Sequence, residues 1–330
     1  MGRIVLITTF FFLGLFVSTA VSQDDTESRS VSEQLEAARE RATTNDYELR
    51  YQFTVNEVIR TRVTHLVTIE TRINGISQTA QTRSISVKIW RIVDVDERGS
   101  ITLVNSIDSV NMWQQGSGQV AITYNSETDE EPPLVYQQVA DSIGIPLSTI
   151  TISRRGKILT RQDHLDQAGG DMGGLTVPLP EGRVKVGDVW TDLTQIRVPL
   201  RDGRVRMIRV RQRYELEDVS TGVATIDVRT EVLSPLNDPW IEAQLVQRMQ
   251  NGTVRFDIDA GRLISRQMDM DETVIGFSGA DSTMNYLARF TEEPLPAEQE
   301  TQPRTTRREG EENGSRPALD GVDQVRSPQR

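Results

Sequence analysis

The sequence predicts a mainly β protein with minor α content: a duplicated, long-strand antiparallel sheet, strongly curved or an open barrel, with one helix per repeat. Three observations lead to this fold class. Apolar residues alternate with a period of two over most of residues 46–291, turn signals separate these stretches, and landmarks of the first half return in order in the second.

The N-terminus has the pattern of a secretory signal peptide, predicted over residues 1–22. Arg3 precedes an apolar run over residues 4–17, and small residues follow up to Ser22, so that cleavage after Ala20 or after Ser22 fits the recognition positions. A membrane-spanning helix needs about 20 apolar residues. We therefore expect cleavage rather than an uncleaved anchor, no stable membrane insertion afterwards, and a secreted or periplasmic product.

Polar segments flank the predicted sheet. Residues 23–45 indicate a polar linker in which residues 31–42 could form a short helix. Residues 292–330 are rich in Pro, Glu and Arg and contain no aromatic residue, which predicts a disordered tail.

Residues 46–168 form the first predicted β repeat. Residues 57–73 place apolar side chains at odd positions, Asn74-Gly75 is a turn signal, and residues 84–95 alternate again with their apolar side chains at odd positions. A two-residue turn would set apolar against polar positions. The pattern therefore predicts a three-residue connection over residues 74–76, or a bulge that corrects the register. Further strands are expected over residues 100–110, 119–124, 147–153 and 157–161.

A Gly-rich join over residues 169–180 precedes the second β repeat, residues 181–291. Its expected strands cover residues 190–199, 205–218, 223–233, 253–259, 263–277 and 284–291. Each repeat also has one amphipathic helical stretch, residues 133–143 and 239–250. Each stretch begins with Pro and is followed by a Gly, Gly144 or Gly252.

Paired landmarks indicate the duplication. Residues 55–59 correspond to 186–190, and residues 90–103 correspond to 214–226 through a turn glycine, Gly99 or Gly222. Residues 156–162 (GKILTRQ) match residues 261–267 (GRLISRQ) without a gap.

The turn-rich segment 179–190 (LPEGRVKVGDVW), together with the Pro132-Pro133 helix before Ile152, resembles an exported bacterial β-domain family of unassigned function. The resemblance covers most of residues 46–291 and rests on structural turns, so it implies no activity. Long strands with one or two helices are also similar to outer-membrane lipoprotein carrier-type half-barrels, an analogy of fold alone.

Composition excludes several classes of function. The net charge of −11 and the pI of about 4.9 argue against nucleic-acid binding, which depends on neutralising phosphates. The absence of Cys excludes disulfides, thiol nucleophiles and Cys-bound zinc. The sequence contains no nucleophile elbow, Ser-x-x-Lys pair, zinc-protease motif or nucleotide-binding glycine loop.

The two histidines are weak site candidates. His65 falls on the apolar face of the first strand, opposite Ile85 if the connection holds three residues, and is interpreted as a neutral core side chain rather than a ligand or base. His164 lies between Asp163 and Asp166 and is interpreted as solvated, although such a His could bind metal.

Charged runs also have simple explanations. Acidic pairs at residues 94–99, 257–261 and 269–272 lack the full calcium-loop pattern and indicate the solvent-exposed face of a sheet. The acidic run at residues 127–131 indicates an exposed loop. An arginine ridge over residues 201–213 could bind anions. The hairpin register predicts instead that Arg213 faces Asp227 and that Arg209 faces Glu231, which leaves Arg211 opposite Arg229.

The sequence therefore predicts no catalytic, cofactor-binding or metal-binding residue and no cofactor. The first hypothesis is an exported, non-catalytic binding or scaffold protein whose curved sheet holds an apolar small molecule or lipid. The alternative is a structural or interaction protein of the cell envelope with a solid core and a protein partner. An enzyme, such as a hydrolase using carboxylates only, has the least support.

Overall fold

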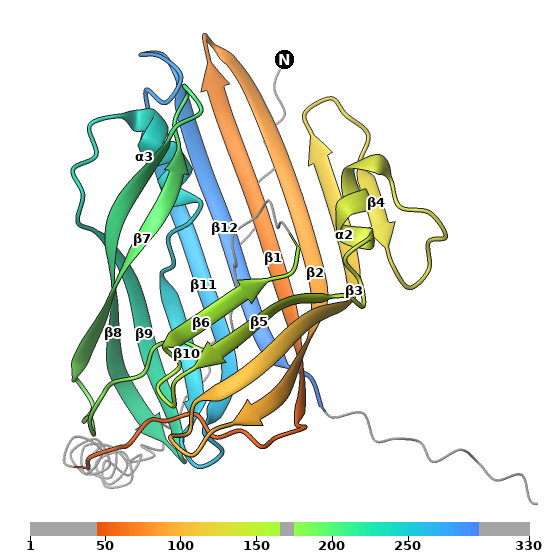
Figure 1. Ribbon diagram of the computed structural model, residues 1–330. Coiled ribbons are helices and arrows are strands. Elements are labelled where there is room, and N and C mark those ends of the chain that lie inside the picture. Colours follow the sequence, from red (N-terminus) through yellow and green to blue (C-terminus); the bar gives the residue numbers. More distant parts are fainter. Residues whose placement is uncertain (1–44, 166–174, 297–330) are drawn as a thin grey trace, which may run out of the picture. The chain divides into compact units, whose positions relative to one another are not determined.

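The computed structural model describes residues 45–165 and 175–296 (Figure 1). The predicted signal peptide (1–22), the predicted linker up to residue 44, residues 169–174 of the Gly-rich join and the tail from residue 297 lie outside the described residues. The expectations for those segments remain predictions.

The described chain forms one antiparallel sheet, which confirms the mainly β fold class. Its strand order is β6-β5-β3-β2-β1-β12-β11-β10-β9-β8-β7, and β4 pairs with β3 beside this path. The sheet curves strongly (Figure 1) and does not close, because β6 and β7 are its two edges. The strands are β1 (Val58–Ile73), β2 (Ile76–Val95), β3 (Ile101–Gly116), β4 (Ile122–Asn125), β5 (Pro146–Ile152), β6 (Ile158–Asp163), β7 (Val189–Pro199), β8 (Val205–Ser220), β9 (Val223–Val232), β10 (Gly252–Asp257), β11 (Arg262–Ile275) and β12 (Thr283–Pro294).

Both predicted helical stretches contain helix, although less of it than expected. The first holds η1 (Leu134–Tyr136) and α2 (Gln137–Ala140), and the second holds α3 (Pro239–Val246). Asp238 caps α3 because its side chain accepts a hydrogen bond from the Trp240 backbone N–H, and Pro239 occupies the first turn.

Strand order follows the predicted duplication. Strands β1-β2-β3-β5-β6 of the first half and β7-β8-β9-β10-β11 of the second are neighbours in the same sequence, with a helical insertion after the third strand of each series. Strand β12 lies between β1 and β11 and joins the two series into one sheet. The copies therefore follow one another along the sheet in the same orientation.

The β1–β2 connection corrects the predicted register. Ile73 pairs with Ile76 across the two-residue turn Asn74-Gly75, and no bulge shifts the pairing along these strands. Both turn residues have positive φ, 51° and 80°, as a tight hairpin turn requires. The three-residue connection was therefore wrong.

The error arose because β2 is apolar on both faces. Trp90 and Ile92, at even positions, are fully buried in the core, whereas Ile85, Val87 and Ile89 are half-buried on the outer face. Alternation read from the odd positions alone selects the wrong face, since period two cannot distinguish two apolar faces.

The β8–β9 hairpin is also shifted from its predicted register. Ser220 pairs with Val223 around a Thr221-Gly222 turn, and a bulge lies between Leu216 and Asp218. Arg213 consequently faces Arg229, and Arg211 faces Glu231 rather than Arg229.

One end of the curved sheet is closed by a large core. Side chains from β1, β2, β3 and β5 pack there against side chains from β8 to β12, and Trp90, Tyr214 and Phe256 are its largest fully buried members. Residues 47–53 cross this end as a strap. The strap residues Tyr51 and Gln52 donate their backbone N–H groups to the carbonyls of Arg154 and Gly261 in the β5–β6 and β10–β11 turns.

One boundary prediction was wrong at this core. Glu292, predicted to begin the disordered tail, is a buried residue of β12. Composition misjudged this residue because partner strands supply the burial that its polar segment lacks by itself. Leu175, Val177 and Leu179, in the described end of the Gly-rich join, are buried in the same core, and the Tyr51 hydroxyl both donates to the Val177 carbonyl and accepts from its N–H.

Candidate functional site

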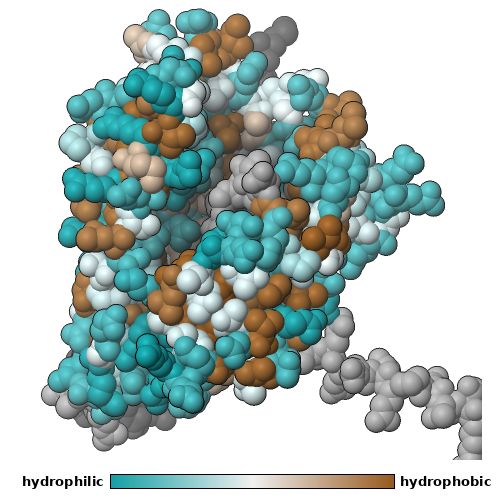
Figure 2. All heavy atoms as spheres, viewed as in Figure 1, coloured by the Kyte–Doolittle hydropathy of each residue, from teal (hydrophilic) through white to brown (hydrophobic). Residues whose placement is uncertain are grey.

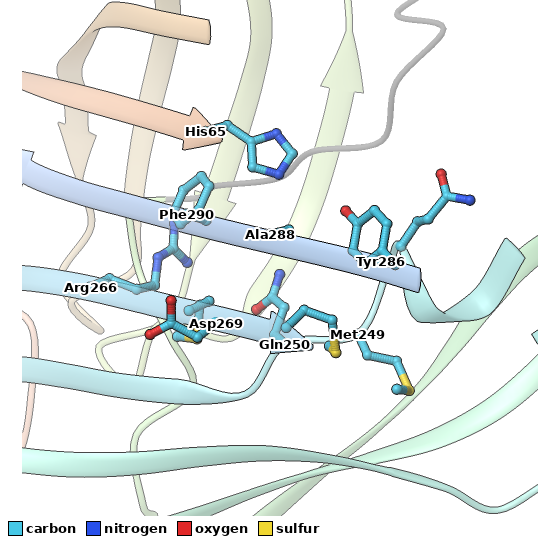
Figure 3. Close-up of a pocket in the computed structure, with 11 residues that line it drawn as sticks. His65, Met249, Gln250, Arg266, Asp269, Tyr286, Ala288 and Phe290 are labelled. Atoms are coloured by element: carbon cyan, nitrogen blue, oxygen red, sulfur yellow. The ribbon is translucent and has the colours of Figure 1, made fainter. Parts of the chain in front are cut away.

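A pocket opens on the inner face of the sheet, between strands β1, β12 and β11 on one side and the residues that follow α3 on the other (Figure 3). Alternation places the side chains of β12 at even positions and those of β1 at odd positions on this face. The lining residues are His65, Gln247, Met249, Gln250, Arg266, Met268, Asp269, Met270, Tyr286, Ala288 and Phe290.

Helix α3 sets one rim of the pocket. Its Ala243 and Val246 pack on β11 and β12, while its Ile241 and Leu245 pack on β7 and β8. The helix therefore bridges two distant parts of the curved sheet, and the chain leaving it is held by hydrogen bonds.

Two of these bonds fix the segment that carries Met249. The Gln250 backbone N–H donates to the Thr230 hydroxyl over 3.0 Å, and the Asn251 side-chain oxygen accepts from the Thr230 N–H over 2.8 Å. The thioether of Met249 itself stays half-buried at the rim.

The floor is apolar and rich in methionine. Met268, Met270, Ala288 and Phe290 are each no more than 9% exposed, and Tyr286 extends the floor towards Met249 (Figure 3). Unbranched thioethers are flexible and polarisable, so this floor can adapt to apolar groups of different shape.

A buried ion pair lies at one side of the pocket. Arg266 donates to the Glu292 carboxylate, and both side chains are 5% exposed. The Arg266 guanidinium also lies 5.1 Å from the centre of the Phe290 ring. Glu292 Oε1 has no hydrogen-bond donor within the part of the chain that the structure describes.

His65 lies next to this pair on the inner face of β1. Its ring meets Phe290 edge-on at 6.3 Å, and burial lowers the pKa of the imidazole below its usual value of 6.5. His65 faces Ser84 and Phe290 rather than Ile85, because the β1–β2 register differs from the prediction. Its expected place on the apolar face is confirmed.

The pocket is small in the state described. Counting its open mouth, it contains about 430 Å³ of atom-free space, but only about 40 Å³ of this admits the centre of a water molecule. A single water needs about 10–15 Å³ on that measure. A larger guest would therefore have to displace the rim or the methionine side chains.

The other candidate residues have local partners. His164 Nε2 and the Thr149 hydroxyl are 2.9 Å apart, and the neighbouring Asp163 pairs with Arg161. Asp166 lies outside the described residues.

The acidic pairs support turns and ion pairs. Asp96 accepts from the Ser100 N–H, Asp257 accepts from the Ala260 N–H, and Asp269 binds Arg289. No cluster of three or more His, Asp or Glu residues in residues 45–165 and 175–296 is arranged to hold a metal ion.

The arginines of the predicted ridge contact several different groups and do not converge on one site. Arg201 stacks on Trp240 at 4.8 Å and donates to the Phe277 carbonyl, and Arg206 donates to the Pro235 carbonyl. Arg211 pairs with Glu231, and Arg213 pairs with Glu215. The predicted pairing of Arg213 with Asp227 was therefore wrong.

Sequence reasoning missed the pocket and its ion pair. Arg266 occupies an inner position of β11 and pairs across the sheet with Glu292, a contact between positions 26 residues apart. An arginine at an otherwise apolar position was the available signal, but its partner had been assigned to the tail.

No family model matches the chain, and no curated protein sequence matches it significantly. Among solved structures, a lipovitellin structure titled for lipid-protein interactions is similar with a TM-score of 0.40 and 10% identity over 74% of this chain. The chain spans about a quarter of that structure's length, since 25% of it is covered.

Two further structures are less similar. DynF, from the dynemicin biosynthesis pathway of Micromonospora chersina, has a TM-score of 0.21 and 5% identity over 74% of this chain and 83% of its own. The translocator domain of the autotransporter NalP from Neisseria meningitidis has a TM-score of 0.21 and 9% identity over 82% of this chain and 98% of its own. Similarities this weak assign neither family nor function to the chain.

Within the described ranges, no helix combines the length and the apolar character needed to cross a membrane.

Proposed function

We propose that this chain is a non-catalytic binding protein that holds an apolar or amphipathic small molecule, such as a lipid chain, against the inner face of its curved sheet. The observation that carries the proposal is the methionine-lined pocket between α3 and strands β11 and β12. Apolar pockets with a few polar groups at one side are the usual sites for such ligands.

The pocket fits an elongated apolar group with a polar end. Its floor is formed by Met268, Met270 and Ala288. Arg266, Asp269 and His65 provide polar groups at one side, and Gln247 and Gln250 add side-chain amides at the rim. Because the enclosed space is small, binding requires Met249 and Gln250 at the rim to move outward.

The proposal includes export and the absence of catalysis. Export is supported by the signal-peptide pattern of residues 1–22. The absence of catalysis is supported by the lack of nucleophile and nucleotide-binding motifs in the sequence. Mass spectrometry of the exported product should find an N-terminus at Val21 or Gln23; an intact leader would contradict this part.

One observation favours a second function, that of a structural or interaction protein of the cell envelope. The space in the pocket that is open to the centre of a water molecule, about 40 Å³, is far below the roughly 300 Å³ typical of ligand sites. A solid core with no ligand would have this property.

A fluorescent fatty acid, dansyl-undecanoate, separates the two functions. We expect saturable binding by the wild-type chain, and at least about tenfold weaker binding by Ala288→Phe, because the added ring fills the pocket. Ile275→Phe is the matched control: this residue of β11 is 67% exposed and does not line the pocket, so the same ring there leaves binding unchanged.

Two outcomes contradict the binding function. The first is no saturable binding by the wild type, which favours the structural role. The second is equal binding by Ala288→Phe and Ile275→Phe. Because Ala288→Phe could overpack the core, Met249→Trp at the rim provides a second test of the same pocket.

A further inference from the structure

Charge is strongly segregated along this chain. Residues 99–153 contain six acidic residues and no Lys, Arg or His, whereas residues 195–213 contain seven arginines and one aspartate. The first segment includes β3, β4 and the helical insertion, and the second includes the last five residues of β7 and the first half of β8.

The arginine-rich segment, together with the preceding Leu193, forms a surface on the outer face of the β7 edge. This surface is here called the basic edge and is defined by Leu193, Arg197, Val205, Met207 and Arg209. Cross-strand pairing puts Arg197 opposite Met207, so these side chains share one face. Leu193 is 71% exposed, and Val205 and Met207 are about half exposed, at 49% and 46%.

The two arginines of the basic edge are available to form ion pairs with a partner molecule. Arg197 and Arg209 are exposed, and neither has a carboxylate within salt-bridge distance among the described residues. Strand β7 is moreover an edge of the sheet, so its outward backbone groups have no neighbouring strand in the described part of the chain. Figure 2 shows apolar groups interspersed with polar ones on the visible face.

The acidic segment projects at the other side of the sheet. The loop between β4 and η1, together with the first two residues of η1, is here called the acidic knob and is defined by Glu127, Glu130, Glu131, Leu134 and Val135. All three glutamates are exposed, Leu134 is 93% exposed and Val135 is 53% exposed. The knob therefore presents negative charge beside apolar side chains, which complements the basic edge.

The two surfaces lie far apart within one chain. Strand β4 pairs with β3 in one half of the sheet, β7 is the far edge of the other half, and Figure 1 places them on opposite sides. Contact between them thus requires two copies.

We propose that the acidic knob of one copy binds the basic edge of a second copy of this chain. Opposite charges steer the contact, and the exposed aliphatic side chains on both surfaces become buried in it. Such an interface is heterologous: each copy keeps one free knob and one free edge, so the copies associate head to tail into open chains rather than a closed dimer. Salt weakens the contact because both surfaces are solvent-exposed.

Sedimentation velocity of the full-length chain, over a range of concentrations at low and at high salt, tests the proposal. We expect a series of species that grows with concentration at low salt and shrinks at high salt. Reversing the edge (Arg197→Glu with Arg209→Glu) or the knob (Glu130→Arg with Glu131→Arg) should each weaken self-association at least about tenfold.

Mixing the two variants is the decisive measurement. The edge-reversed variant keeps its knob and the knob-reversed variant keeps its edge, so the two variants can pair through one wild-type contact. The two reversed surfaces are again of opposite charge, so the mixture should regain the head-to-tail association that neither variant shows alone. Arg72→Glu and Glu70→Arg, at exposed positions of β1 away from both surfaces, are matched controls and should behave as wild type. Unchanged circular dichroism shows that each variant is folded.

Three results would overturn the proposal. The wild-type chain could stay monomeric at every concentration, the mixture of the two variants could fail to associate, or the control variants could lose self-association to the same extent as the edge and knob variants. Binding to vesicles of phosphatidylglycerol is measured in parallel for the wild type and the edge-reversed variant. Vesicle binding that is lost on edge reversal, without any self-association, would assign the basic edge to an anionic membrane instead.

Discussion

The two ends of the curved sheet differ in how their apolar side chains are organised. At the end closed by the strap, one continuous cluster joins strands of both repeats, with Trp90, Ile92, Tyr214, Leu216 and Phe256 at most 2% exposed. At the end that carries α3, the buried side chains form two separate, smaller clusters, and the pocket opens beside one of them. A third small cluster lies among β3, β4, η1 and α2.

This difference separates stability from binding. Continuous cores unfold at the highest free energy, whereas regions with fewer shared contacts open more readily, and binding sites are drawn from the latter. The closed end therefore contributes most of the stability of the fold, and the side chains at the α3 end can move to admit a ligand.

The largest expected effect concerns the ion pair between the two ends. Glu292→Gln leaves Arg266 buried without its charge partner and should lower the free energy of unfolding by about 3–5 kcal/mol. The double variant Arg266→Met with Glu292→Leu should recover most of this loss, since no uncompensated charge remains. Urea denaturation measures both. A loss below about 1 kcal/mol for Glu292→Gln would contradict a tightly coupled pair.

The next prediction probes the closed end. Gly156 and Gly261 are equivalent turn residues of the two repeats, both with positive φ, and both turns contact the strap. A Cβ at Gly156 would lie 2.5 Å from Cε2 of the strap residue Tyr51 and 2.5 Å from the Val177 carbonyl oxygen, and one at Gly261 would lie 2.8 Å from the Arg50 carbonyl oxygen. We expect each alanine substitution to cost about 2 kcal/mol or more.

Gly75→Ala is the control for that prediction, since Gly75 also has positive φ but has open space around its Cα. It should cost only the backbone term, about 1–2 kcal/mol. Equal costs at all three glycines would show that the strap contributes nothing to closing this end.

The smallest effect concerns His65 beside the pocket. Burial lowers its pKa in the folded state, so the unfolded chain binds more protons below the ordinary value of 6.5. Stability is therefore fully present above about pH 6.5 and falls as the pH drops below it, by at most about 1.4 kcal/mol per unit of pKa shift.

Comparing the pH dependence of unfolding for wild type and His65→Gln isolates this contribution. The variant should lose the part of the slope that lies below about pH 6.5. Identical slopes would mean that His65 is not desolvated at this end.

Much of the fold followed from the sequence because period two and turn glycines are local signals. The strand positions and the paired landmarks around Gly99 and Gly222 needed no tertiary information. Registers failed where β2 buries Trp90 on one face and half-buries Val87 on the other, since alternation alone cannot choose between two apolar faces.

The pocket could not be predicted because its parts come together only through pairing in the sheet. Met249 follows a helix, Met270 belongs to β11 and Ala288 to β12, and no shared motif marks them. Glu292 shows the same limit: its segment is polar and rich in proline, yet strands β1 and β11 on either side bury its carboxylate.

Methyl NMR of the chain labelled at its methionine methyl groups, titrated with dansyl-undecanoate, tests most directly whether the α3 end binds the ligand. We predict that the signals of Met249, Met268 and Met270 shift together and saturate, while that of Met207, which is 46% exposed on the outer face of β8, does not move. Single Met→Leu variants assign the signals. Shifts confined to Met207, or no saturating shift at any of the three pocket methionines, would contradict a ligand site at this end of the sheet.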